Sequence, residues 1–188
     1  MLARHPRLRK QTSLFQTTGA RYSVRRVRGL LLIVTTIAAC GAPRYPPSSN
    51  HALLGRRLPE IHHQETLDGA RFDSGELRGK PVLVKFFADY CEPCKATLPA
   101  AERVHAAHPD VLFIGIDEDE RIDTAEAVAK RFGLTFPVLY DRGNVLSGRF
   151  RVSAMPMSFV ADADGVIRWV GDEGQTEADL TRAVEATR

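Results

Sequence analysis

Two cysteines separated by two residues, Cys91 and Cys94, have the type and spacing for chemistry. Such a pair can bind a metal, form a structural disulfide or exchange electrons with another disulfide. The pair follows an apolar run and precedes a helical pattern, so we expect it at the N-terminus of a helix. Backbone N–H groups and the helix dipole favour negative charge there, and the thiolate is the reactive form of cysteine.

The two residues between the cysteines modulate this chemistry. Pro93 suits the first turn of a helix, where its missing N–H group is not needed. Glu92 places a carboxylate beside Cys91, which should raise the pKa of that thiol. A raised thiol pKa disfavours a strongly oxidising pair, whose reduced form must be unusually stable. Thiol–disulfide exchange in the reducing direction is the interpretation that we favour.

A zinc site would need two further ligands, and a structural disulfide would leave the position of the pair unexplained. No second Cys-X-X-Cys pair occurs. Adjacent histidines such as His62 and His63 rarely chelate one ion together. His105 and His108 lie far along the expected helix, and we expect them to be solvated. We therefore expect no metal and no small cofactor besides the redox-active cysteines.

The charges of the chain are unevenly distributed. Residues 1–40 carry eight Lys or Arg and no acid, which leaves 18 basic and 23 acidic residues in the remainder. This mildly acidic remainder argues against nucleic acid as a partner. The basic segment leads into an apolar run at residues 29–39, much shorter than the roughly 20 residues of a membrane span.

The apolar run ends in Ile-Ala-Ala-Cys at Cys40, which resembles a bacterial lipobox. Together with the basic segment it has the anatomy of an export signal. We predict an export signal at residues 1–39 and an acylated Cys40 at the start of the mature chain. An ordinary signal peptide with an incidental cysteine is the alternative. Residues 40–57 are rich in proline and predict an extended tether without a core.

Residues 58–188 have the length of one domain, and their hydrophobic periodicity alternates between strand and helix. We expect a hairpin at 69–72 and a turn or short helix at 73–77. Asp123 with Glu126 resembles a capping box, Gly133 should end that helix, and Thr176 should cap the last one. The order predicts an α/β domain with a mixed sheet, parallel crossovers first and an antiparallel hairpin last. The expected strands are 81–87, 111–116, 137–140, 157–160 and 166–170, and the expected helices are 93–108, 123–132, 144–150 and 176–186.

Several of these segments resemble the thioredoxin superfamily. The sequence V-L-V-K-F-F-A-D-Y-C-E-P-C-K resembles its active-site strand and helix start, and A-M-P-M at residues 154–157 resembles its cis-proline loop. Residues 165–169 resemble the terminal hairpin. The segment between Ile116 and Val152 resembles the insert of membrane-anchored TlpA/ResA-type proteins. The resemblance covers residues 58–188 and implies a thioredoxin-like mixed sheet flanked by helices.

The resemblance also implies roles for individual residues. Cys91 would attack and Cys94 would resolve the mixed disulfide. Pro156 would lie against the disulfide, and the backbone of Met155 would pair with an extended substrate. Tyr90 keeps an aromatic platform where tryptophan is usual.

Two departures from the family pattern affect the expected chemistry. ResA-type reductases act in cytochrome c maturation, but Thr97 replaces their usual glutamate and puts that substrate in doubt. Lys85 occupies a strand position where thioredoxins carry a buried acid. A buried lysine would have a lowered pKa and would be able to move a proton or lower a cysteine pKa. Alternatively its stem carries the ammonium group to the rim of the domain, and we favour this second interpretation.

Together these features predict a thiol–disulfide oxidoreductase outside the cytoplasm that reduces disulfides in exported proteins. We expect a monomer held to a bacterial membrane through Cys40, facing the periplasm or exterior, and recharged by a membrane electron donor. A copper-binding or other binding lipoprotein is an alternative, because Met155 and Met157 flank Pro156 and soft sulfur suits Cu(I). A redoxin-type peroxidase is a lesser alternative, since Ala88 replaces the threonine which that chemistry needs.

Overall fold

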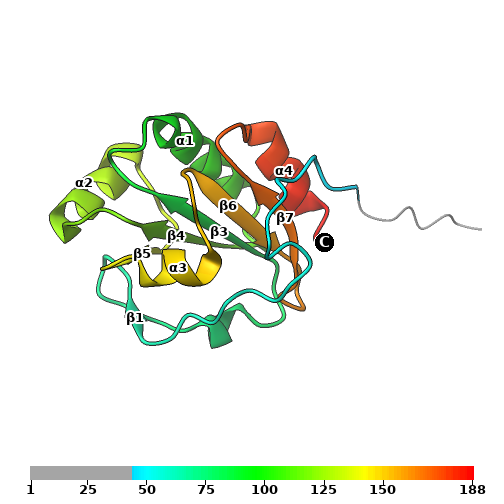
Figure 1. Ribbon diagram of the computed structural model, residues 1–188, viewed down its shortest axis with the longest axis horizontal. Helices are drawn as coiled ribbons and strands as arrows, with labels where there is room; N and C mark the ends of the chain where they lie inside the picture. Colours follow the sequence, from blue (N-terminus) through cyan, green and yellow to red (C-terminus); the bar gives the residue numbers. More distant parts are fainter. Residues whose placement is uncertain (1–43) are drawn as a thin grey trace, which may run out of the picture. The chain divides into compact units, whose positions relative to one another are not determined.

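The computed structural model describes residues 44–188, and the predicted export signal and Cys40 lie outside this part (Figure 1). Five strands form one mixed sheet in the order β5–β4–β3–β6–β7. The strands β3, β4 and β5 are parallel, whereas β6 is antiparallel to both β3 and β7. The predicted mixed sheet is confirmed. Its strands are β3 Val82–Phe87, β4 Leu112–Asp117, β5 Val138–Tyr140, β6 Met157–Ala161 and β7 Ile167–Gly171.

Helices cover both faces of this sheet (Figure 1). The first face packs against α1 Glu92–Ala107, α2 Ile122–Phe132 and α4 Glu177–Glu185. The second face packs against α3 Val145–Phe150 and the 3₁₀ helix η1 Ser74–Leu77. A two-stranded hairpin, β1 Gln64–Glu65 and β2 Arg71–Phe72, accompanies this second layer. Within residues 44–188, no helix has the length and apolar character needed to cross a membrane.

The central strand β3 is buried over all six residues, because layers lie against both of its faces. Leu83 and Phe87 join the core beneath α1, whereas Val84 and Phe86 join the core beneath α3. Pro99 lies inside α1, and the helix continues past it to Ala107. The carboxyl end of β3, and the cysteines that follow it, therefore lie at one fixed edge of the sheet.

The capping box expected at Asp123 and Glu126 is wrong. Arg121 occupies the N-cap of α2 and makes no capping hydrogen bond through its side chain. Asp123 lies one residue inside the helix, where its carboxylate accepts from the Arg121 guanidinium and from the backbone N–H of Thr124. The predicted N-cap at Thr176 is confirmed. Thr176 is the N-cap residue of α4 and forms a capping box with Asp179.

The described part of the expected tether packs against the domain instead of standing free. The backbone N–H of Ser49 donates to the Val170 carbonyl at 2.8 Å, and that of Gly55 donates to the Ile167 carbonyl at 2.8 Å. Strand β7 is an edge strand, so this segment covers backbone groups that would otherwise be unpaired. The segment before the expected domain start at residue 58 thus makes backbone contacts with a strand more than 100 residues further along the chain.

Candidate active site

Cys91 and Cys94 lie at the start of α1, directly beyond the carboxyl end of β3. Cys91 is the N-cap residue, and its Sγ atom accepts a hydrogen bond from the Cys94 backbone N–H at 3.2 Å. The two cysteines form a disulfide, with their Cα atoms 5.3 Å apart. Cys91 is 6% exposed and Cys94 is completely buried. An incoming group therefore reaches Cys91 first, as the predicted roles require.

A cavity of about 390 Å³ opens beside Cys91. It brings together most of the predicted site residues, although they come from separate segments of the chain. The peptide bond between Met155 and Pro156 is cis, as the resemblance implied, and Pro156 itself is buried behind the cavity wall. The cavity is lined by Tyr90, Cys91, Glu92, Pro93, Glu118, Val152, Ser153, Ala154 and Met155.

Carboxylates at the end of β4, which the sequence analysis missed, lie at this site: Glu118 lines the cavity, and Asp117 and Asp119 flank it in the sequence. Asp117 is completely buried, and burial followed by the charge of nearby Asp119 raises its pKa to about 7. Its Oδ1 atom accepts from the Asp119 backbone N–H at 2.9 Å. Asp119 in turn accepts from the backbone N–H of Asp89, in the loop before Cys91, at 3.0 Å. The sequence did contain a signal for these carboxylates. They lie at the end of β4, and parallel strands end at the same edge of a sheet, so they were to be expected near the cysteines that follow β3.

Lys85 is completely buried, so the interpretation that we favoured, an ammonium group at the rim, is wrong. It lies in the central strand between Leu83 and Phe87, where the covering helices leave its stem no route to solvent. Its Nζ atom donates to the Ser158 hydroxyl at 3.4 Å, and that hydroxyl donates to Gln175 Oε1 at 2.6 Å. Burial lowers the pKa of Lys85 to about 7.

The two methionines beside Pro156 lie on different faces of the sheet. Met155 packs against the core that contains both cysteines, whereas Met157 belongs to the core on the opposite face. Met155 lies in the loop before β6, so the alternation of side chains along that strand does not determine its position. Of the two methionines considered as copper ligands, only Met155 lines the cavity beside Cys91.

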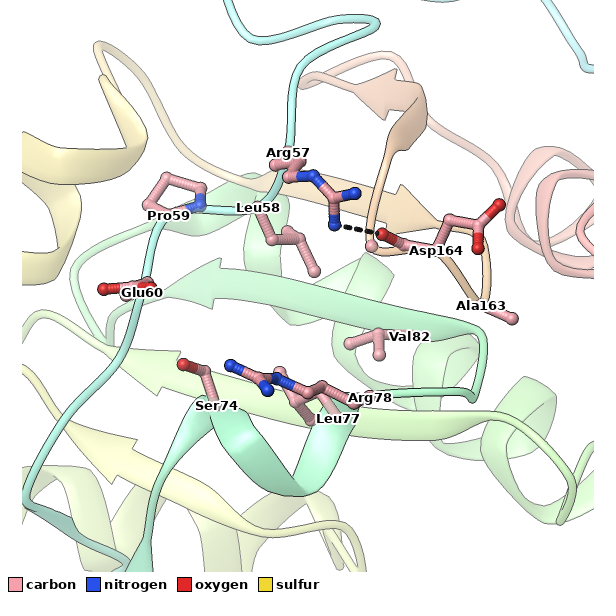
Figure 2. A pocket seen from close by; sticks show the side chains of 11 residues that line it. Arg57, Leu58, Pro59, Glu60, Ser74, Leu77, Arg78, Val82, Ala163 and Asp164 are labelled. Carbon is pink, nitrogen blue, oxygen red and sulfur yellow. Dashed lines mark hydrogen bonds between the residues drawn. The ribbon is translucent and has the colours of Figure 1, made fainter.

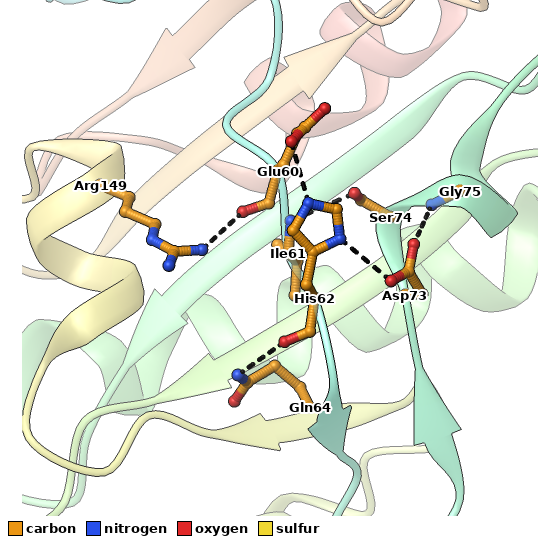
Figure 3. Close-up of polar contacts among 8 residues, drawn as sticks. All are labelled: Glu60, Ile61, His62, Gln64, Asp73, Ser74, Gly75 and Arg149. Carbon is orange, nitrogen blue, oxygen red and sulfur yellow. Dashed lines mark hydrogen bonds and ion pairs between the residues drawn. The ribbon is translucent and has the colours of Figure 1, made fainter.

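The four histidines considered as metal ligands have other neighbours. Figure 3 shows His62 between Glu60 and Asp73, with ring nitrogens 2.9 and 3.0 Å from the two carboxylates. These hydrogen bonds raise the pKa of His62. The prediction that His105 and His108 are exposed to solvent is wrong. His105 packs against Phe113 and Phe136, and His108 is buried beside Arg188. None of the four histidines, His63 included, lines the cavity beside Cys91.

A second cavity, of about 420 Å³, lies near Val82 at the opposite end of β3 from the cysteines (Figure 2). Arg57 and Arg78 line it, and the Arg57 guanidinium donates to the Asp164 carbonyl at 2.8 Å. Its lining contains no cysteine, so the redox chemistry of this domain belongs to the cavity at Cys91.

A protein-family model described as the AhpC/TSA family matches residues 54–170. The chain belongs to this family. Thiol-disulfide oxidoreductase ResA from Bacillus cereus is 25% identical over 152 residues, which cover 77% of this chain and 87% of the relative. Soluble secreted antigen MPT53 from Mycobacterium tuberculosis is 33% identical over 107 residues, 57% of this chain and 62% of the antigen.

A solved structure supports the same relationship. The crystal structure of a secreted Mycobacterium tuberculosis disulfide oxidoreductase, described as homologous to E. coli DsbE, aligns with a TM-score of 0.62 and 29% identity. The alignment covers 65% of this chain and 93% of that protein. The predicted thioredoxin-like fold and the relationship to ResA-type proteins are confirmed, and the homologues are thiol–disulfide oxidoreductases.

Proposed function

We propose that this protein reduces disulfides in exported proteins through the dithiol form of Cys91 and Cys94. One observation carries the proposal: Cys91 borders an open cavity at a helix N-terminus while Cys94 is buried directly behind it. A structural disulfide has no need of such a cavity. An exchange reaction needs it, because the substrate disulfide must approach the attacking sulfur.

The reaction transfers two electrons from the protein to the substrate. The Cys91 thiolate attacks one sulfur of the substrate disulfide, forms a mixed disulfide and releases the other sulfur as a thiolate that takes up a proton. Cys94 then loses its proton and attacks Cys91. The mixed disulfide breaks, the second substrate thiol leaves, and the Cys91–Cys94 disulfide remains. No bound cofactor takes part in these steps.

The charges around Cys91 support the reducing direction. Glu92 and Glu118 both line the cavity, and carboxylates near a sulfur disfavour its thiolate form. Lys95 lies 2.5 Å from Glu92 and offsets part of that effect at an exposed position. A pair with a less stable thiolate holds its electrons less tightly and is a better reductant.

The relatives support export, since ResA and the secreted antigen are among them. We further propose that a lipid on Cys40 holds a monomeric domain at a bacterial membrane, where a membrane electron donor reduces the disulfide again. The Cys40→Ala variant tests the anchor by fractionation of cells. Release of the variant into the soluble fraction is expected, and unchanged attachment to the membrane contradicts the anchor.

The reduction potential and two cysteine variants test the catalytic proposal. Equilibration with defined thiol buffers should give a potential near that of thioredoxin, about −270 mV, and a value near about −120 mV would reverse the direction. Cys91→Ser should abolish exchange, whereas Cys94→Ser should accumulate mixed disulfides with substrate. Full activity of Cys91→Ser overturns the assigned roles.

Copper binding is the second candidate, and the position of Met155 beside the cysteines favours it. Soft sulfur ligands suit Cu(I), so equimolar tight binding of Cu(I) without exchange activity would establish this function instead. A peroxidase has less support, because buried Ala88 supplies no hydroxyl three residues before Cys91. Rapid turnover of hydrogen peroxide would reverse that judgement.

A further inference from the structure

The side chains around the cavity at Cys91 are acidic or neutral. Glu92 and Glu118 are its charged members, and among the described residues no Lys, Arg or His lines it. Tyr90, which is 68% exposed, and Met155 supply an aromatic and an apolar surface. The volume of about 390 Å³ accommodates a long side chain in addition to the substrate sulfur. The cavity therefore offers negative charge and an aromatic ring but no positive charge.

Glu118 differs from an ordinary surface acid because it is 9% exposed and its Oε1 atom lacks a hydrogen-bond partner in the part of the chain that the structure describes. Its Oε1 atom is buried and has no hydrogen-bond partner among residues 44–188. The nearby Ser147 hydroxyl has a single proton, which it donates to Asp141 at 2.8 Å. Burial raises the pKa of Glu118. A buried carboxylate without compensation is costly, and an incoming cation would supply that compensation.

Two basic side chains, one on α1 and one on α2, have acidic partners. Lys95 pairs with Glu92 at 2.5 Å, and Arg131 pairs with Asp89 at 2.8 Å. Glu118 has no such partner within the described part of the chain. The acids of this segment also act on Tyr90, whose pKa is raised first by burial and then by their negative charges. The charged side chains that line the cavity beside Cys91 are thus both acidic.

We propose that this cavity selects substrate segments that carry a Lys or Arg beside the attacked cysteine. The cationic head would pair with Glu118, and the apolar stem would pack against the exposed ring of Tyr90. This inference rests on the proposed function and adds the substrate class. Glu118 is then the residue that determines specificity, and Glu92, exposed and already paired with Lys95, contributes less.

Short peptides test the inference on the full chain. Each contains one cysteine linked to thionitrobenzoate as a mixed disulfide, and the residues on both sides of that cysteine are Arg, citrulline, Gln or Glu. The protein carries Cys94→Ser and Cys40→Ala, so that Cys91 alone attacks the peptide sulfur and releases coloured thionitrobenzoate. Each rate constant is divided by that for dithiothreitol, an uncharged thiol, which removes the intrinsic reactivity of the peptide.

The Arg peptide should react about tenfold faster than the Gln peptide, and the Glu peptide should react slowest. Glu118→Gln should bring the Arg-to-Gln ratio close to one. The matched control Glu120→Gln removes the same charge from the same segment, but its side chain lines a different cavity, so the ratio should persist. Citrulline has the shape of arginine without its charge. The citrulline peptide should therefore react with Cys91 at the rate of the Gln peptide, and this comparison tests the role of charge without any Glu118 variant.

Three results overturn the inference. Equal rates for Arg and citrulline show that charge is not read, and equal losses in Glu118→Gln and Glu120→Gln assign the preference to the general field instead of the cavity. In both cases the proposed function stands, because Cys91 still exchanges. Failure of Cys91 to react with any peptide, while dithiothreitol reacts with all of them, removes the proposed function and the inference together.

Discussion

The Nζ atom of Lys85 lies 3.4 Å from the Oγ atom of Ser158 at the centre of the sheet, completely shielded from solvent. The two residues face each other in the antiparallel pairing of β3 with β6. The Ser158 hydroxyl donates to Gln175 Oε1, and the Gln175 Nε2 atom donates to the Pro156 carbonyl at 3.3 Å. A polar chain therefore runs through the core from a buried lysine to the loop that borders Cys91.

The Lys85→Met variant should be more stable than the parent, by an amount that depends on pH. The lysine pKa is about 7 in the folded protein and 10.5 in the reference state, so between these values the unfolded chain binds the extra proton. Its cost to stability is thus complete below about pH 7 and disappears as the pH rises towards about 10.5. Urea unfolding at about pH 6 should show a gain of several kcal/mol, and at about pH 9 a smaller one. An equal gain at both values would contradict this origin, and exposed Lys80→Met is the control.

The Gln175→Leu variant should lose stability and slow the exchange reaction. Its amide accepts from Ser158 at 2.6 Å and donates to the carbonyls of Asp172 and Pro156 at 2.7 and 3.3 Å. Removal leaves buried polar groups unpaired, which costs about 1–3 kcal/mol each before relaxation. The loop at Pro156 also loses a restraint, so the rate of attack by Cys91 on a peptide disulfide should fall along with the Tm. The more exposed Gln64→Leu should change neither quantity, and an unchanged rate in Gln175→Leu excludes this restraint from catalysis.

The Asp117→Asn variant should also gain stability, but with the opposite dependence on pH. Burial raises the pKa of Asp117 from 3.8 to about 7, so the folded protein binds the extra proton between these values. The cost is absent below about pH 4, grows as the pH rises and is complete above about pH 7. Asparagine keeps an Oδ1 acceptor for the Asp119 backbone N–H. Urea unfolding should therefore show little difference from the parent at about pH 4 and a gain of a few kcal/mol at about pH 8. A gain that falls with pH would show that Asp117 is not a buried acid of raised pKa.

The elements around the cysteines were predictable because their signals are local. The apolar run of β3, the Cys-X-X-Cys start of α1 and the turn between β6 and β7 each lie within a few consecutive residues. Tyr90, Pro93 and Met155 line the same cavity as Cys91, and a sequence motif fixes the position of each relative to it. Neighbouring residues determine such features, and the rest of the chain only has to accommodate them.

The residues that the sequence analysis misplaced or missed depend on contacts with distant parts of the chain. Lysine normally reaches the surface, and the partners that hold Lys85 inside come from β6 and from the loop before α4. Glu118 belongs to a run of acidic residues, a pattern typical of a solvent-exposed segment. Only its position at the end of β4 distinguishes it from the other acids of that run. The prolines before residue 50 predicted a tether without a core, but gave no sign that this segment would bond to the backbone of β7.

The segment that covers β7 contains two adjacent serines for which the structure predicts opposite results. The Ser48 hydroxyl accepts from the Val170 backbone N–H at 2.9 Å and donates to the Val170 carbonyl at 3.2 Å. The Ser49 hydroxyl is buried and has no hydrogen-bond partner within the described residues. Removal of the first hydroxyl leaves an edge-strand N–H unpaired, whereas removal of the second eliminates an unpaired polar group.

Ser48→Ala should therefore lower the free energy of unfolding by about 1 kcal/mol, whereas Ser49→Ala should leave it unchanged or raise it slightly. The single tryptophan, Trp169, reports on the same contact, because its Nε1 atom donates to the Pro47 carbonyl at 2.9 Å. Loosening of the segment should expose the indole to water and shift its emission to longer wavelength in Ser48→Ala only. Equal effects of the two substitutions on stability and emission would show that the segment does not hold β7 through the Ser48 hydroxyl.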